Sequence, residues 1–417
     1  MAQLSDDCFA FSGPLMPIED AERLIAERVT PVAETEEVPL GEARGRVLAS
    51  DLIAPLALPP FDNSAVDGYA VRHADLAKQG ETRLPIMGRA AAGHAANVPF
   101  SGGAAIRIFT GAPMPPGADT VFMQEDCRVE NGAVILPHGL KRGANRRFAG
   151  EDVRAGSVAL PEGTRLKPPQ LALAAALGAE TVHVRRRLRV ALFSTGDEVA
   201  EPGTSLTEAR IYDANRRLLT ELLVASGAEV TDLGILADTP ESVAAALASA
   251  ASHDLIVTSG GVSTGEADHV RDAVERVGRL VFWRVALKPG RPVAMGVIGG
   301  AAFVGLPGNP VAAFVTFVRV VRPLLAQLAG AQLAPLVPLP VRAAFSYKKK
   351  KGRREYVRVS LCHADGGMLE AVKFPREGAG VLSSLTETDG LAELAEDVTA
   401  VAPGDTIGFL PYAVLMG

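Results

Sequence analysis

The sequence predicts a multidomain α/β protein whose central domain is a doubly wound, mostly parallel sheet. The first observation is that short apolar segments alternate with amphipathic segments from about residue 181 to residue 330. The second is that a polar, glycine-containing loop follows several of the apolar segments. The third is length, because 417 residues exceed the usual size of a single domain.

Composition narrows the class of protein. An apolar content of 48% allows a large core, and a net charge of −6 argues against a nucleic-acid partner, whose binding surface would be basic. Cys8, Cys127 and Cys362 lie too far apart for a CxxC site, which favours a reducing, cytoplasmic location. No secretory signal is visible. Arginines interrupt the apolar stretch 311–329, so we expect no membrane span.

The N-terminal domain is expected to be discontinuous, with residues 1–54 and 147–180 forming one mixed α+β unit. Residues 18–29 have the apolar spacing of a helix, and residues 40–52 predict a second short helix. Residues 169–177 predict a third helix, which a glycine ends.

Residues 55–146 are expected to form a small β domain inserted into the first one, because short strands alternate there with glycine turns. Clear examples of such strands are residues 120–123 and 133–136. Asp67 lies at a turn just before a strand, and by itself is most simply a carboxylate that caps its own turn. The alternative is a carboxylate displayed for function. Thr110 likewise lies in an ordinary turn.

A cluster of arginines, Arg142, Arg146 and Arg147, precedes Asp152 at the end of the inserted domain. This segment fits a solvated loop of mixed charge. It equally fits an anion site beside a cation site, and the sequence alone leaves both open.

The α/β domain at 181–330 gives the clearest pattern. Polar loops follow its predicted strands, and the carboxyl ends of parallel strands meet at one edge of a sheet, where such folds bind ligands. We therefore expect these loops to lie together. The predicted strands are 188–194, 230–236, 255–259, 280–286, 293–298 and 301–305, the predicted helices are 214–226, 241–252 and 269–278, and a last helix begins at Pro310.

The residue types in these loops suit magnesium and phosphate. After Ser259, the turn Gly260-Gly261 offers backbone N–H groups to an anion. Carboxylates are the ligands that Mg²⁺ prefers, and cations neutralise phosphate oxygens. No HExxH or Cys/His set supports zinc, and no Ser–His–Asp pattern is evident. The residues alone predict a Mg²⁺-assisted enzyme acting on a phosphorylated small molecule. Its candidate groups are the carboxylates Glu198, Asp238, Asp268 and Asp67 and the cations Lys288, Arg284 and Arg291.

Residues 335–417 predict a β-rich, barrel-like C-terminal domain, with strands at 341–346 and 356–361. The basic run 348–354 between these strands is most simply a solvated hairpin tip. Its alternative is a phosphate clamp contributed to a neighbouring site.

Six motifs in order carry a resemblance to a known family: PPFDNSAVDGYAVR, RIFTGAPMPPGAD, FSTGDEV, SGGVSTGEAD, KPGRP and GLPGNP. Together they span nearly the whole chain, which resembles the molybdopterin molybdenumtransferase family, including the gephyrin E domain. The resemblance implies that the substrates are adenylylated molybdopterin and molybdate. It also implies Mg²⁺-dependent hydrolysis of the adenylate, release of AMP, and metal insertion to give molybdenum cofactor. The family forms elongated homodimers with active sites between subunits.

The resemblance assigns roles residue by residue and overturns the simple interpretations of Asp67 and Thr110. Arg284 stands where many members have lysine, and Ala379 stands where some have serine, a contact that Ser383 or Ser384 would replace. The expected catalytic residues are Asp67, Glu198, Asp268 and Lys288, and the expected metal ligands are Glu198, Asp238 and Asp268. The expected substrate-binding residues are Thr110, Asp152, Ser259, Gly260, Gly261, Ser263, Arg284, Arg291, Pro307, Pro310 and Arg358.

Two rival functions belong to other classes. A non-catalytic pterin-binding scaffold would not need to keep Asp67, Glu198, Asp238 and Asp268, and would carry a further domain and a long linker. A molybdopterin adenylyltransferase would consist essentially of the α/β domain alone. The sequence therefore favours the transferase, working with other proteins of cofactor biosynthesis.

Overall fold

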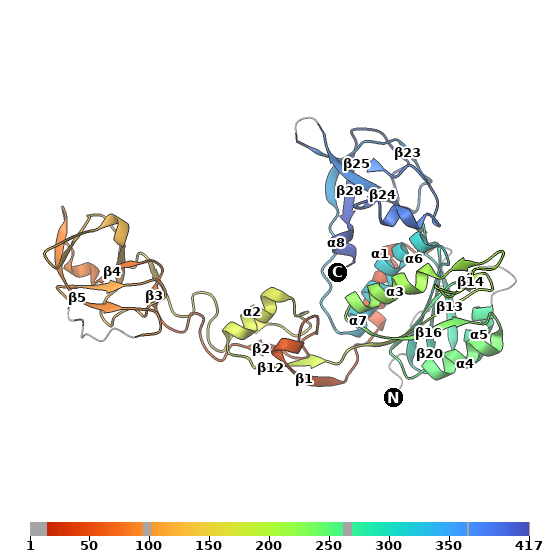
Figure 1. Ribbon diagram of the computed structural model, residues 1–417, viewed down its shortest axis with the longest axis horizontal. Coiled ribbons are helices and arrows are strands. Elements are labelled where there is room, and N and C mark those ends of the chain that lie inside the picture. Colours follow the sequence, from red (N-terminus) through yellow and green to blue (C-terminus); the bar gives the residue numbers. More distant parts are fainter. Residues whose placement is uncertain (1–14, 95–99, 101, 262–268, 365–366, 417) are drawn as a thin grey trace.

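The computed structural model describes residues 15–94, 100, 102–261, 269–364 and 367–416. The molecule is elongated, and a small β-sheet lobe lies at one end of it, joined to the remainder through a narrow middle region (Figure 1). The α/β sheet and the C-terminal strands form the bulkier end.

The helix predicted near the N-terminus is present as α1 (Ile18–Arg28). Its buried residues Ile18, Ala21 and Ile25 belong to the same apolar cluster as one face of the α/β sheet. The chain therefore begins against the α/β core before it enters the middle region.

The prediction of a second short helix at residues 40–52 is wrong. Only the 3₁₀ turn η1 (Leu40–Glu42) forms, and the chain then extends. Gly45 has a φ of +77°, which lies outside the helical region, and the backbone of Leu48 bridges to Val184. Long-range strand pairing outweighs the local helical periodicity here.

Short paired strands and one helix complete the middle region. Helix α2 ends just before Gly178, whose φ of +83° terminates it as predicted. The elements are β1 (Thr35–Pro39) with β12 (Thr181–Arg185), β2 (Leu52–Ile53) with β11 (Val158–Leu160), and α2 (Pro168–Ala176).

The lobe is a six-stranded sheet in the order β7-β4-β6-β5-β9-β8, with an apolar cluster on each face. The strands predicted at 120–123 and 133–136 are present as β7 and β9. The pair β3 (Asn63–Ser64) and β10 (Arg146–Arg147) joins the lobe to the middle region. The remaining bounds are β4 (Gly68–Val71), η2 (His73–Asp75), β5 (Thr82–Ala90), β6 (Ala105–Ile108), β7 (Thr120–Met123), η3 (Gln124–Asp126), β8 (Arg128–Glu130) and β9 (Ala133–Leu136).

The central sheet has the order β16-β13-β17-β21-β20-β18. Its first four strands run parallel, and β20 and β18 are antiparallel, so the predicted mostly parallel sheet is confirmed. Its strands are β13 (Arg189–Thr195), β16 (Glu229–Leu236), β17 (Leu255–Ser259), β18 (Arg279–Arg284), β20 (Pro292–Ile298) and β21 (Ala301–Leu306), and β14 (Val199–Ala200) pairs with β15 (Ile211–Tyr212) beside it.

Helices cover both faces of this sheet, as a doubly wound fold requires. One apolar cluster joins the sheet to α1, α3, α6 and α7, and the other joins it to α4 and α5. Thr239 is the N-cap of α4, because its hydroxyl accepts a hydrogen bond from the N–H of Ser242 at 3.3 Å. The bounds are α3 (Ala214–Ala225), α4 (Pro240–Ala250), α5 (His269–Val277), α6 (Pro310–Thr316), the π-helical turn η4 (Phe317–Val321) and α7 (Arg322–Leu328).

The last three of these elements form one apolar helix, Pro310–Leu328. Among the described residues it is the one helix that is long and apolar enough to cross a membrane, but 83% of its apolar 18-residue window is buried inside the fold. It is therefore the core helix of the α/β domain.

The C-terminal strands close into a ring, because β24 pairs with both β25 and β26 and the order β24-β25-β22-β28-β26 links the rest. Strand β19 of the preceding domain pairs with β24 and attaches the ring. The bounds are β19 (Leu287–Lys288), β22 (Leu339–Ala343), β23 (Tyr347–Lys348), β24 (Arg354–His363), β25 (Leu369–Lys373), η5 (Leu382–Leu385), β26 (Gly390–Leu394), β27 (Ala400–Val401), β28 (Thr406–Pro411) and α8 (Tyr412–Leu415).

The basic run 348–354 is not a simple hairpin tip, because β23 pairs with β27 and not with β24. Lys349 is buried and its Nζ donates to the carbonyl oxygens of Ala395 and Val398, both at 2.7 Å. Lys348, Lys350 and Lys351 are exposed, so the solvated interpretation holds for these three lysines.

Candidate active site

Polar loops follow β13, β16, β17 and β21, which are neighbours and run parallel. Their carboxyl ends therefore meet at one edge of the sheet, as the sequence predicted. Side-chain and backbone contacts hold these loops together at the edge.

Asn215 ties two of these loops together from the first turn of α3. Its buried side-chain amide donates to Ser259 Oγ at 2.9 Å and to the carbonyl oxygen of Gly308 at 2.6 Å. The predicted residue Ser259 thus uses its hydroxyl to hold the loops. Sequence reasoning missed Asn215. Its signal was a polar residue in line with Leu219 and Leu222 on the buried face of a helix.

Two carboxylates lie where β13 and β16 end. Asp238 is half-buried, and its Oδ1 accepts a hydrogen bond from the Thr195 hydroxyl at 3.0 Å. Glu198 is exposed and folds over Gly196, where an added Cβ would stand 2.6 Å from the carboxylate. Thr195 precedes Gly196, so both predicted metal ligands lie next to the same turn.

The backbone of the Gly260-Gly261 turn packs closely against Thr195. Gly260 has a φ of +89°, and an added Cβ would stand 2.7 Å from the carbonyl oxygen of Thr195. At Gly261 an added Cβ would stand 2.8 Å from the Thr195 side chain. The N–H of Gly260 already donates to the carbonyl of Leu306 at 3.1 Å, so this group is unavailable to an anion, contrary to the expectation. Asp268 and Ser263 lie outside the described residues, and their roles stay predictions.

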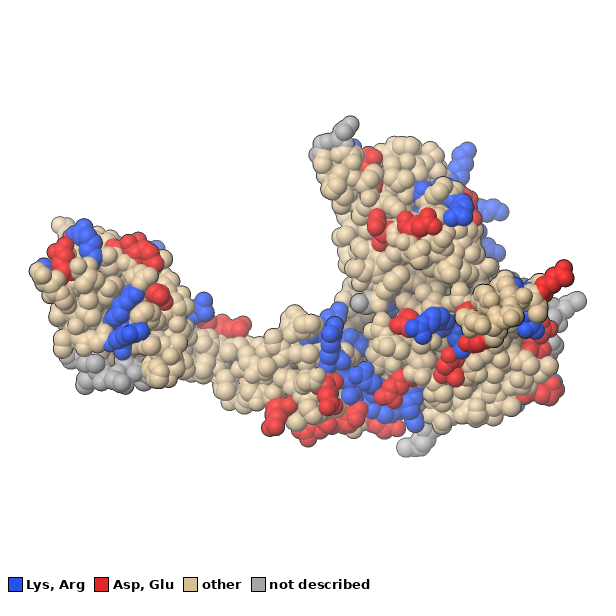
Figure 2. All heavy atoms as spheres, viewed as in Figure 1, with Lys and Arg blue, Asp and Glu red and all other residues tan. Residues whose placement is uncertain are grey.

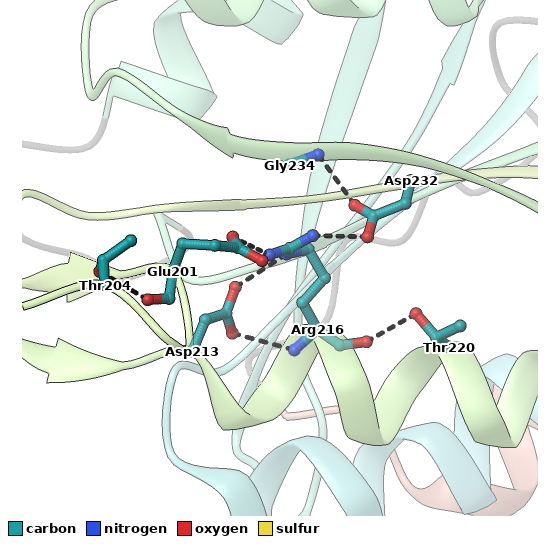
Figure 3. A network of polar contacts seen from close by, with 7 residues as sticks. All are labelled: Glu201, Thr204, Asp213, Arg216, Thr220, Asp232 and Gly234. Atoms are coloured by element: carbon teal, nitrogen blue, oxygen red, sulfur yellow. Dashed lines mark hydrogen bonds and ion pairs between the residues drawn. The ribbon is translucent and has the colours of Figure 1, made fainter.

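A buried arginine fixes the segment that carries Glu198 (Figure 3). Arg216 Nε donates to Asp213 at 3.1 Å, and its two terminal nitrogens pair with Asp232 and Glu201. Burial alone would lower the pKa of this guanidinium, but the three carboxylates outweigh it and raise the pKa. The network holds the chain between β13 and α3 against β16.

A cavity of about 360 Å³ opens between the α/β domain and the C-terminal ring. It brings together three predicted residues, Lys288, Pro307 and Arg358, and adds two cations that sequence reasoning missed, Lys373 and Arg376. Its mixture of cations and rings is suited to an anionic ligand. The other lining residues include Tyr347, Tyr356, Phe374, Asn309 and Glu377.

Lys288 is held at this cavity by a buried carboxylate that the sequence did not point to. Its Nζ donates to Glu355 Oε2 at 3.1 Å and to the Tyr347 hydroxyl at 3.2 Å, and the Tyr347 hydroxyl donates to the same Oε2 at 2.8 Å. Arg353 Nε donates to the other oxygen at 2.7 Å. Burial would lower the pKa of Lys288, but these hydrogen bonds raise it, so the ammonium stays charged.

Arg358 lines the same cavity without a carboxylate partner among the described residues. Its Nε donates to Ser384 Oγ and its Nη2 to the carbonyl oxygen of Gly378, both at 3.0 Å. Burial lowers the pKa of this arginine. Ser384 therefore supplies a hydroxyl beside Arg358, and the backbone of Ala379, which lines the cavity, accepts from the N–H of Val311.

Other predicted residues are not among those that line the cavity, although Arg291 and Pro310 are chain neighbours of lining residues. Arg284 and Arg291 are exposed near the β18–β20 end of the sheet, and Pro310 is the first residue of α6. Asp152 is exposed, and its N–H donates to the carbonyl of Leu58 at 3.1 Å.

The arginine cluster before Asp152 is largely paired locally. Arg142 bonds Asp119 at 2.7 Å, and Arg146 pairs with Asp62. These contacts favour the loop of mixed charge over an anion site.

Asp67 and Thr110 form a pair of their own in the β-sheet lobe. Asp67 Oδ1 accepts from the N–H of Thr110 at 2.8 Å and from its hydroxyl at 2.7 Å, and these hydrogen bonds lower the pKa of Asp67. The lobe and the edge of the central sheet lie at opposite ends of the molecule (Figure 1). Within one chain, Asp67 and Asp238 therefore do not belong to the same site.

Comparison with known families covers most of this architecture. Residues 16–178 match the MoeA N-terminal region (domain I and II), residues 191–327 match a probable molybdopterin binding domain, and residues 340–412 match the MoeA C-terminal region (domain IV). The molybdopterin molybdenumtransferase of Haemophilus influenzae is 38% identical over 406 residues, 97% of this chain and 100% of that protein. The chain belongs to the molybdopterin molybdenumtransferase family.

Further members agree in length and fold. Molybdopterin molybdenumtransferase 2 of Mycobacterium tuberculosis is 36% identical over 93% of this chain and 97% of its own length. The crystal structure of the molybdopterin biosynthesis moeA protein from Pyrococcus horikoshii OT3 has a TM-score of 0.79 at 30% identity, covering 95% of this chain and all of that one. The resemblance inferred from the six motifs is thus confirmed for the family and for the fold.

Proposed function

We propose that this enzyme inserts molybdenum into adenylylated molybdopterin and hydrolyses the adenylate in a Mg²⁺-dependent step, releasing AMP and molybdenum cofactor. The observation that carries the proposal is the pairing of an oxygen-rich sheet edge with a cation-lined cavity. Full-length relatives of the chain are named molybdopterin molybdenumtransferase, which supports the choice of substrate.

The cavity supplies the cations that the substrates need, since molybdate and the phosphate groups are all anionic. Arg358 presents a desolvated guanidinium and Lys288 an ammonium held by Glu355. Charged donors form the stronger hydrogen bonds with oxyanions. In this proposal Lys288 and Arg358 hold the anionic end of the substrate against Pro307.

The carboxylates at the sheet edge fit a Mg²⁺ site in which the substrate supplies the remaining ligands. Among the described residues no three His, Cys, Asp or Glu side chains cluster as a metal site. Mg²⁺, however, is commonly held by one or two carboxylates together with substrate phosphates and water. Asp238 and Glu198 would supply those carboxylates, and Asp268 is proposed as a third. When bound, the ion would neutralise charge on the phosphoanhydride oxygens.

A homodimer would complete the site. The lobe, which carries Asp67 and Thr110, lies at the other end of the molecule from the central sheet (Figure 1), so a two-fold partner would have to bring its lobe to this edge. We also propose that the protein works in the cytoplasm beside other proteins of cofactor biosynthesis. The separated cysteines support that location.

The proposal is tested by incubating the protein with adenylylated molybdopterin and Mg²⁺, with and without molybdate. We expect AMP release that depends on molybdate, together with molybdenum retained on the pterin. Asp238→Asn should reduce turnover by two or more orders of magnitude while keeping the fold, since it removes one proposed ligand. Glu229→Gln, which removes an exposed carboxylate at the other end of β16, is the control and should turn over normally.

Two outcomes would contradict the proposal in different ways. Tight pterin binding without AMP release would favour the scaffold. Formation of the adenylate from nucleoside triphosphate would favour the adenylyltransferase, although the N-terminal and C-terminal regions of this chain are foreign to a one-domain enzyme.

A further inference from the structure

The lobe carries an unusual surface next to Asp67. One row across the sheet contains Arg89 on β5, Arg107 on β6 and Tyr69 on β4, which are registered opposite one another. Side chains of residues in such a row lie on the same face of the sheet. Phe109, two residues after Arg107, shares that face.

The arginines and rings in this row are stacked. Arg89 lies 4.6 Å from the centre of the Phe109 ring, and Arg107 lies 4.9 Å from the same ring and 5.0 Å from that of Tyr69. Each distance is within the range of a cation–π contact. Phe109 is thus in contact with two guanidinium groups.

The stacking contacts involve the faces of the guanidinium groups, so the N–H groups in the guanidinium planes can still donate hydrogen bonds. Arg107 donates through Nη1 to the carbonyl of Gly68 at 3.1 Å and through Nη2 to Gln124. Its Nε–H therefore has no hydrogen-bond partner among the described residues. Arg89 is exposed, and none of its donors has a partner among the described residues. No described carboxylate forms an ion pair with either arginine. Gln124 is in turn hydrogen-bonded to Glu125 at 3.0 Å.

The position of the row relates it to the proposed site. Arg107 lies close enough to Asp67 to contribute to the low pKa of that carboxylate, after the two Thr110 hydrogen bonds. It also holds the carbonyl of Gly68, the residue after Asp67. A ligand that reaches Asp67 and Thr110 would therefore lie beside Arg107, and Arg89 is registered next to Arg107 on the neighbouring strand.

We propose that Arg89 and Arg107 form a phosphate-binding site, by which the lobe of one subunit holds the adenylate phosphate of substrate bound at the partner's sheet edge. An aromatic ring already stacks on each guanidinium group, and Arg107 has two, so the remaining in-plane N–H groups favour an oxyanion over a stacked heterocycle. This inference rests on the proposed function.

The test measures binding of AMP and of adenosine to the full-length protein by isothermal titration calorimetry. Arg89→Met removes the free donors and keeps the apolar stem. It should weaken AMP binding about tenfold, the loss expected when a charged hydrogen bond is removed, and leave adenosine binding unchanged. Arg107→Lys, which keeps the charge without the planar fork, should lose less affinity than Arg107→Met. Arg83→Met on the same strand is the matched control and should bind AMP as the wild type does.

The outcomes separate this inference from the proposed function. Unchanged AMP affinity in Arg89→Met and Arg107→Met, with normal turnover, would overturn the phosphate site and leave the function standing. Equal weakening of AMP and adenosine would overturn the assignment to phosphate. A wild-type protein that neither binds nor releases AMP would refute the function, and the site with it. Thermal unfolding of each variant verifies that the fold is kept.

Discussion

At the scale of single residues, buried polar groups decide which side chains are available for chemistry. Lys288 was predicted from its motif, but its position at the cavity depends on Glu355, whose side chain is 1% exposed. The carboxylate has three partners, and their hydrogen bonds lower its pKa against the effect of burial. A buried charge of this kind is stable only while its partners remain.

Glu355→Gln should therefore destabilise the protein by about 2–3 kcal/mol, because it leaves Lys288 and Arg353 without their shared charge. Urea unfolding measures this change. Glu377→Gln, which removes an exposed carboxylate paired with Lys373, should cost less than about 0.5 kcal/mol. Equal stability losses in the two variants would refute the role of Glu355.

Cys127 illustrates how burial suppresses reactivity. Burial, followed by the nearby charge of Asp126, raises the pKa of this thiol to about 11, and Sγ donates to the carbonyl of Met123 at 3.1 Å. At pH 8 only about one thiol in a thousand is then ionised.

We expect iodoacetamide at pH 8 to modify the exposed Cys362 and to leave Cys127 largely unmodified, as measured by peptide mass spectrometry. Labelling of Cys127 should rise as the pH approaches 11. Rapid labelling of Cys127 in the folded protein at pH 8 would contradict this.

At the scale of elements, the edge of the central sheet depends on how closely the strand ends approach one another. Gly260 combines a positive φ with a Cβ position 2.7 Å from the carbonyl of Thr195. Gly234 on β16 also has a positive φ, +78°, but an added Cβ there meets nothing within 4 Å. A comparison of substitutions at Gly260 and Gly234 therefore distinguishes the cost of backbone strain from the cost of a steric clash.

Gly260→Ala should cost about 2–4 kcal/mol of stability and most of the activity, since strain and a clash combine. Gly234→Ala should cost only about 1 kcal/mol, the penalty for φ alone. Thermal unfolding and AMP release measure both effects. A Gly260→Ala variant no less stable than Gly234→Ala would show that the strand ends can move apart.

At the scale of the whole molecule, the elongated shape separates groups that the proposed reaction needs together. Space-filling shows the lobe as a separate body carrying both signs of charge, with further basic groups gathered where the middle region meets the α/β domain (Figure 2). A second chain is the simplest source of the missing half of each site.

Mixing Asp67→Ala chains with Asp238→Asn chains should therefore restore about a quarter of wild-type activity, because half of the random dimers contain one intact site of two. Each variant alone should be inactive. Sedimentation of the wild type should give the mass of a dimer. No restoration in proven mixed dimers would place both residues in one chain's site.

The sequence by itself determined the strands, their polar loops and the family, because alternation of apolar segments and six local motifs are properties of neighbouring residues. Tertiary structure alone decided what residues 40–52 do, since the pairing of Leu48 with Val184 outweighs a local helical pattern. It also decided the partners of Lys288 and Ser259. Glu355 and Asn215 reach them across long stretches of chain, and only burial in the folded protein makes those polar contacts necessary.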